Sequence, residues 1–92
     1  MKQEFAEEIA IKALGWLASS DDLLPVFLGA TGARIEDLRD AANDPAFLCS
    51  VLDFVTMDDA WVVGFCDRSG LQYDLPAQAK ALLAGPASMH WT

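Results

Sequence analysis

Short apolar segments, each preceded by helix-capping residues, set the strongest constraint on how this chain of 92 residues folds. Side-chain oxygens at the start of a helix accept hydrogen bonds from its first free backbone amides, and acidic groups there interact favourably with the helix dipole. Such residues precede three apolar segments, namely LLPVFL at 23–28 after SSDD, AFLCSVLDFV at 46–55 after NDP, and AWVVGFC at 60–66 after TMDD. The pattern predicts a short helix in each segment.

The N-terminal segment shows the clearest helical periodicity. Between Gln3 and Ser19 the apolar residues recur on one broad face, with Glu4 and Glu8 on the opposite side. Two more helices are expected over 33–42 and 75–84. The stretch VLDFVTMDDAWVV is rich in β-branched residues, but its acidic pair interrupts any strand pattern. We therefore expect an all-α fold, an irregular compact bundle of five or six short helices.

Two stretches of the chain are nearly alike, FLGATGARIEDL at 27–38 and FCDRSGLQYDL at 65–75. A shift of 38 positions aligns them and places Gly32 on Gly70. A glycine just past a helix end adopts a positive φ at little cost and so turns the chain. Two interpretations stay open: helices and glycine stops recur by chance in small α-proteins, or the chain contains two related helical hairpins that arose by duplication.

Length and composition indicate one folded domain. The chain is 53% hydrophobic with three Trp and five Phe, which is well above the range of disordered proteins and predicts a packed core. A chain of this size has room for a single core. We expect a single helical domain at 1–85 and a C-terminal tail at 86–92.

The charge balance excludes two classes of partner. Fourteen acidic residues outweigh six basic ones to give a net charge of -8, and the basic residues are scattered along the sequence. Nucleic acids and anionic membranes are bound mainly through clustered Lys and Arg, so we expect neither as a partner. The N-terminal MKQEFAEEIA is acidic where a signal peptide is basic and then apolar, which favours a cytoplasmic location.

Residue patterns that carry chemistry are missing from the sequence. Cys49 and Cys66 lack metal-site spacing, and we expect Cys66 to be buried and Cys49 to lie at the edge of an apolar face. His90 has no nearby nucleophile or second ligand. The acidic pairs at 21–22 and 58–59 fit helix caps better than a metal site. We therefore expect no catalytic, cofactor-binding or metal-binding residue, no cofactor and no enzymatic activity.

One long run of residues resembles a known family. FLGATGARIEDLRDAANDPAFLCSVLDFVTMDD, with ALGWLASSDDLL before it and FC and SGL after it, resembles small bacterial proteins grouped as domain of unknown function 3572. That family has an FL-x-x-TG motif followed by DLR, then a helix like DP-x-FL-x-x-VLDF and an acidic step. The resemblance extends over about 6–83 and is most specific over 27–59. It implies a small all-helical domain, and it transfers no functional residue.

Two classes of function stay in contention. The first is a protein-interaction or adaptor domain, covered by another protein or by a second copy of itself. Its candidate surface consists of Ile11, among glutamates on the polar side of the first helix, Leu14 near the border of that side, and the tail residues Met89 and Trp91. Single exposed apolar residues are common, however, and the tail could equally fold back onto the core.

The alternative is a small ligand-binding domain or enzyme with a pocket between helices. Trp16, Trp61 and Tyr73 would be its candidate lining residues. Aromatic residues at helical spacing usually belong to the core, and so small a domain has little space left for a pocket of about 300 Å³. We therefore favour the interaction hypothesis.

Overall fold

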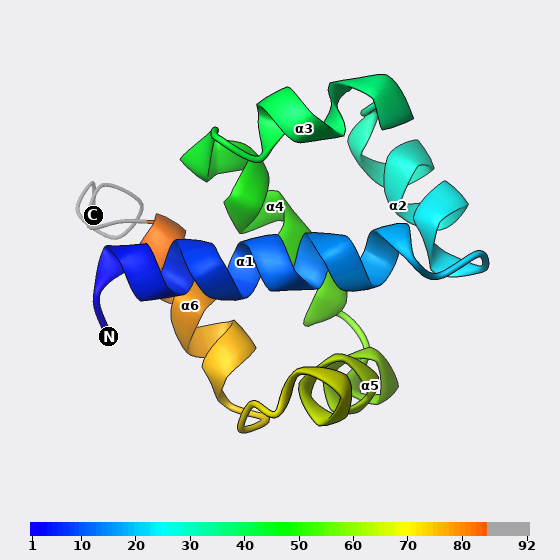
Figure 1. The fold of residues 1–92 in the computed structure, drawn as a ribbon. Coiled ribbons are helices and arrows are strands. Elements are labelled where there is room, and N and C mark those ends of the chain that lie inside the picture. Colours follow the sequence, from blue (N-terminus) through cyan, green and yellow to red (C-terminus); the bar gives the residue numbers. More distant parts are fainter. Residues whose placement is uncertain (85–92) are drawn as a thin grey trace.

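The computed structural model describes residues 1–84, and these form six α-helices and one 3-10 helix without any strand (Figure 1). The elements are α1 (Gln3–Ala18), α2 (Leu23–Thr31), η1 (Ile35–Asp37), α3 (Leu38–Ala41), α4 (Pro45–Val55), α5 (Asp59–Ser69) and α6 (Leu75–Ala84). The expected all-α bundle is confirmed. The expected tail at 86–92 lies outside the described residues.

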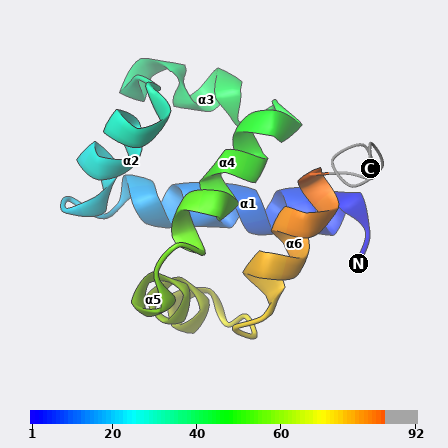
Figure 2. The same ribbon diagram turned by 180° about the vertical axis from the view of Figure 1, so that it is seen from behind.

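Helix α1 is the central element of the bundle. Helices α4 and α6 cross it on one side and also pack against each other, while α2 and α5 pack less extensively against it (Figures 1 and 2). Alanines occupy fully buried positions of α1 and α6, and their small side chains let the helices approach closely. These alanines are Ala6, Ala10, Ala13 and Ala79. Larger side chains fill the rest of the core, namely Ile9, Leu17, Phe27, Leu48, Val51, Leu52, Val55 and Phe65.

Two of the expected helix caps are confirmed in detail. Asp44 accepts a hydrogen bond from the backbone N–H of Ala46 at 3.0 Å, and Asp58 accepts one from that of Ala60 at 2.8 Å. Pro45 occupies the first position of α4, where its missing N–H costs nothing. Helices α4 and α5 therefore begin where the capping residues predict.

The N-terminal cap of α2 is not formed by the acidic pair that directly precedes the helix. The hydroxyl of Ser20 accepts the hydrogen bond from the backbone N–H of Leu23 at 3.2 Å, and Asp22 forms no capping bond with its side chain. Ser20 is thus the capping residue, and Asp21 and Asp22 are exposed in the turn that follows it. Their position still favours them electrostatically, because it is near the positive end of the helix dipole.

Both glycine stops are confirmed. Gly32 follows α2 with φ of 75°, and Gly70 follows α5 with φ of 70°. The N–H of Gly32 donates to the carbonyl of Leu28, and the N–H of Gly70 donates to that of Cys66. Only glycine takes this left-handed conformation without a steric penalty. Gly32 and Gly70, which the near repeat aligns, therefore both end a helix in the left-handed conformation.

We expect Gly32→Ala and Gly70→Ala each to lower the free energy of unfolding by about 1 kcal/mol, because a Cβ strains the left-handed backbone. Urea unfolding followed by circular dichroism measures this. Gly29→Ala is the matched control, since Gly29 lies inside α2 with no atom within 4 Å of an added Cβ, and this change should stabilise by about 0.5–1 kcal/mol. Equal stability of all three variants would contradict the role of the two stops.

The interpretation of the near repeat as two helical hairpins is wrong about how the helices pack. Helix α5 does not pack along α6, and α2 does not pack along η1 or α3; α6 instead packs against α1 and α4. Figures 1 and 2 show the chain turning a corner between α2 and α3, and between α5 and α6, rather than folding back. The reason is that the large buried faces of α4 and α1 offer α6 more apolar surface than α5 does.

The prediction of one continuous helix over 33–42 is also wrong. The structure has the 3-10 helix η1 followed by the four-residue α3, and neither contains a buried residue. Short helices in proteins depend on tertiary packing for their stability, and this segment has little of it, since Leu38 and Ala42 are only partly buried against the core. Pro45 then restricts Asp44 to an extended conformation, φ -100° and ψ 113°, which separates α3 from α4.

Candidate functional site

Helix α1 exposes one side along its whole length. Figure 1 shows this side facing the viewer, with the other helices behind or beside it. Glu4, Glu8 and Lys12 are exposed there, as expected for a solvated face, but two large apolar residues of α1 are also exposed. Phe5 is 39% exposed and Ile11 is 49% exposed. We call this side the outer face of α1.

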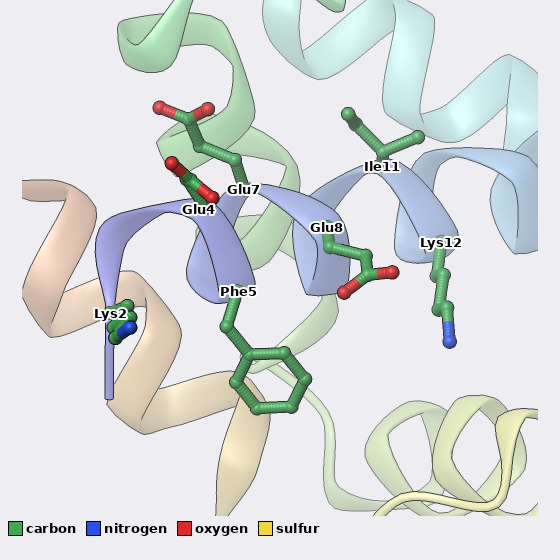
Figure 3. Close-up of a pocket in the computed structure, with 7 residues that line it drawn as sticks. All are labelled: Lys2, Glu4, Phe5, Glu7, Glu8, Ile11 and Lys12. Carbon is green, nitrogen blue, oxygen red and sulfur yellow. The ribbon is translucent and has the colours of Figure 1, made fainter.

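Ile11 lies close to carboxylates on the outer face. Residues 4, 7 and 11 are three or four positions apart, so their side chains line one side of a helix. Figure 3 shows Glu4, Glu7 and Ile11 pointing to the same side of α1, while Phe5 points the other way. Gln3 fixes one of the carboxylates, because its amide nitrogen donates to Glu7 at 3.0 Å.

The outer face is an open surface rather than an enclosed cavity. Every residue that lines its hollow comes from a single segment at the start of α1: Lys2, Glu4, Phe5, Glu7, Glu8, Ile11 and Lys12. An enclosed pocket needs walls from several elements, and one convex helix cannot provide them. This surface therefore suits contact with another macromolecule better than the binding of a small molecule.

The structure separates the residues of the expected interaction surface. Ile11 is exposed, as predicted, but Leu14 is only 7% exposed and belongs to the core. The expectation for Leu14 is wrong because several helices pack against α1 and leave this border residue inside the core cluster. Met89 and Trp91 lie outside the described residues, as does His90.

A second concave surface lies between α2 and α4, and we call it the α2–α4 groove. It has a volume of about 340 Å³. Its walls are formed by Ala30, Thr31, Phe47, Ser50, Asp53, Phe54 and Met57. This groove was not predicted from the sequence, although the spacing of 47, 50, 54 and 57 on one side of a helix was a signal for such a surface.

The aromatic residues proposed for an inter-helix pocket do not come together. Trp16 is tilted against Phe65, with 6.0 Å between the ring centroids, and Trp61 stacks on Phe54 at 4.9 Å. Both tryptophans are partly buried and pack against the core cluster. Tyr73 is exposed on the segment between α5 and α6. These contacts support core packing by both tryptophans.

The sequence profile of DUF3572, a family of proteins of unknown function, matches residues 3–86. The chain belongs to this family. The match confirms the resemblance seen in the sequence and includes every helix of the described DUF3572 fold, α1 through α6. No curated protein and no solved structure matches the chain.

Within residues 1–84 of this DUF3572 domain, no three His, Cys, Asp or Glu side chains gather in a way that could hold a metal ion. Of the acidic pair at 58–59, Asp58 caps a helix and Asp59 is exposed. No described helix is both long and apolar enough to cross a membrane.

The two cysteines of the DUF3572 domain lie in different environments. Cys66 is fully buried, as predicted, and its sulfur lies 3.5 Å from the carbonyl oxygen of Gln72. Burial raises the pKa of the Cys66 thiol above its ordinary value of 9.0, and the charges of Asp67 and Asp74 raise this pKa further. Cys49 is partly exposed, also as predicted. Because thiolate is the reactive form, Cys66 should be the less reactive thiol.

We expect a thiol reagent such as Ellman's reagent to modify Cys49 in the folded protein and Cys66 only after unfolding.

The raised pKa of Cys66 also makes the stability of the domain depend on pH. A folded-state pKa above the unfolded value contributes stability that is present below pH 9.0 and is lost as pH rises through the folded-state pKa. Cys66→Ala should therefore reduce the fall in unfolding free energy above pH 9.0, measured by urea titrations. For the reagent experiment, equal modification rates of Cys49 and Cys66 in the folded protein would contradict the burial of Cys66.

Proposed function

We propose that this domain works by binding another protein through the outer face of α1. One observation carries the proposal: Ile11, a large apolar side chain, is half exposed beside glutamates on a helix side that faces away from the core. Burying such a side chain against a partner contributes roughly 1.5–3 kcal/mol. Phe5 is also exposed on α1, but it points away from Ile11, so Ile11 is the residue on which the proposal rests.

The charges of the outer face support a particular kind of partner. Glu4 and Glu7 lie on the same side of α1 as the exposed isoleucine, and the whole chain carries a net charge of -8. A negative potential accelerates association with basic surfaces and slows association with acidic ones. The best match is an apolar patch with a basic rim. A second copy of this acidic chain would be disfavoured by charge repulsion.

Affinity purification from native lysate tests the proposal. Ile11→Ser should reduce the recovery of the bound protein and leave the melting temperature nearly unchanged, since Ile11 lies outside the core. Ile35→Ser is the matched control, because Ile35 is exposed on η1, away from α1. The control should retain the partner. A large fall in melting temperature for Ile11→Ser, or equal recovery with both variants, would contradict the proposal.

A ligand-binding or enzymatic role has less support. The tryptophans that could have lined a pocket pack against phenylalanines instead. Native mass spectrometry of the purified protein would reverse this ranking if a small molecule stayed bound. The interaction hypothesis predicts the mass of the bare chain, or of a complex with another protein.

A further inference from the structure

We propose that the α2–α4 groove is a second docking site, and that its occupant is a cationic amphipathic helix of a partner protein. The groove lies on α2 and α4, and none of its residues lines the outer face of α1. Figure 2 shows α4 in front of α1, on the side opposite the outer face. The proposal for the groove can therefore be tested independently of the proposal for Ile11.

Phe27 explains why a groove exists between these helices. Its fully buried ring lies between α2 and α4, with centroids 5.8 Å from Phe47 and 5.3 Å from Phe54, in edge-on contacts. The rings join the two helices through their side chains, and the backbones do not pack closely. Ala30 is three positions after Phe27 and lies on the same side of α2, where its short side chain leaves space. The groove is thus built into the core packing.

The shape of the groove fits a helix. Phe47, Ser50 and Phe54 follow one another at spacings of three and four along α4, and Met57 follows three residues later. Ten residues of helix extend about 15 Å, so a partner helix of about ten residues would match this line. Such a helix presents apolar side chains at positions i, i+3 or i+4, and i+7. Met57 is 71% exposed, and its flexible thioether can adapt to those side chains.

The polar groups of the groove select a cation. The hydroxyl of Thr31 donates to the carbonyl of Phe27 at 2.9 Å, and that of Ser50 donates to the carbonyl of Phe47 at 2.6 Å. Both hydroxyl hydrogens are therefore used inside the domain, so these groups do not serve an anionic ligand. Acceptors remain instead, because α2 ends here and the last carbonyls of a helix carry partial negative charge.

Asp53 adds a carboxylate to the same rim. Its side chain is 58% exposed although its carboxylate lies 2.8 Å from the ammonium of Lys80, which neutralises part of its charge. An arginine of a partner helix can bind a carboxylate and helix carbonyls with several N–H groups at once. The net charge of -8 favours the approach of such a helix. Apolar floor and acceptor-rich rim together fit a cationic amphipathic helix.

The test uses a synthetic acetylated peptide of about 14 residues, with leucines at i, i+3 and i+7 and arginines beside them. Its binding is followed by calorimetry and by amide chemical shifts of the full-length labelled protein. We expect the largest shifts at Ala30, Thr31, Ser50 and Met57. A peptide of the same composition, scrambled so that it lacks an apolar face, should bind about tenfold more weakly or not at all.

Ala30→Arg blocks the groove and should weaken peptide binding about tenfold or more. The new side chain starts at an exposed position near the end of α2, where a positive charge suits the helix dipole, so the fold should survive. Ala18→Arg is the matched control, because Ala18 is the exposed last residue of α1 and the charge change is identical. The control and Ile11→Ser should both keep wild-type affinity.

Several results would overturn the proposal. Equal affinity for the scrambled peptide would mean that charge alone drives binding. Shifts centred on Ile11 would place the peptide on the outer face of α1 instead. Self-association of the wild type that Ala30→Arg abolishes would assign the groove to a second copy, and a small molecule retained by the wild type but lost in Ala30→Arg would assign it to a ligand.

Discussion

Replacing Phe27 with alanine should lower the free energy of unfolding by about 3–5 kcal/mol. The side chain is fully buried, and its ring contacts the rings of Phe47 and Phe54 on α4. Removing it takes away these contacts and leaves a cavity in the middle of a small core. Domains have total stabilities of about 5–15 kcal/mol, so the variant should be partly unfolded at room temperature. Urea unfolding followed by circular dichroism measures the loss.

The neighbouring residue provides the control for this prediction. Val26 lies on the same helix but is 52% exposed, and Val26→Ala should change the free energy of unfolding by less than about 0.5 kcal/mol. If Phe27→Ala cost less than about 1 kcal/mol, then Phe27 would not be the link between α2 and α4. The account of how the α2–α4 groove forms would then be wrong as well.

Ala79→Leu should destabilise the domain by about 1–3 kcal/mol or more. Ala79 is fully buried on α6, which packs more extensively against α1 than any other helix does. Helix α1 also carries small buried residues, Ala6 and Ala10, and a larger side chain at position 79 would push the packed helices apart. Thermal unfolding measured by circular dichroism should show a clear fall in melting temperature.

The same substitution on the other side of α6 should have little effect. Ala77 is exposed, and leucine is nearly as good a helix former as alanine, so Ala77→Leu should keep the melting temperature close to wild type. Similar behaviour of the two variants would contradict close packing between α1 and α6.

Local signals in the sequence were sufficient to place most helix boundaries. Asp44 and Asp58 form the predicted caps, and Gly32 and Gly70 form the predicted stops. The helix expected over 75–84 has these bounds in the structure. Such signals work because a cap or a positive φ depends on only a few neighbouring residues.

Features that depend on distant residues could not be predicted in the same way. The helical wheel of α1 places Leu14 near its polar border, but the packing of other helices against α1 buries it. The segment from Ile35 to Ala41 has the composition of a helix, yet it contains no buried residue and only Leu38 packs partly against the core, which is too little to stabilise a long helix. Helix packing, which joins segments far apart in the sequence, decided both cases.

The candidate sites also divide into one that neighbouring residues reveal and one that depends on distant residues. Ile11 was identifiable because an apolar residue among glutamates breaks the periodicity of its own helix. The α2–α4 groove was not identifiable, because Phe47 and Phe54 belong to the apolar face of α4 and look like ordinary core residues in the sequence. Their contacts with Phe27 leave one edge of that face open, and those contacts exist only in the folded domain.

Site-specific photo-crosslinking in native lysate would decide whether this domain binds another protein through the outer face of α1. One variant carries a photoreactive benzoylphenylalanine at position 11. A second variant of the same domain carries it at position 63, where an exposed valine lies on α5. The proposal predicts a discrete cross-linked protein from position 11 that position 63 does not give. The absence of any cross-link from position 11, or the same products from both positions, would contradict it.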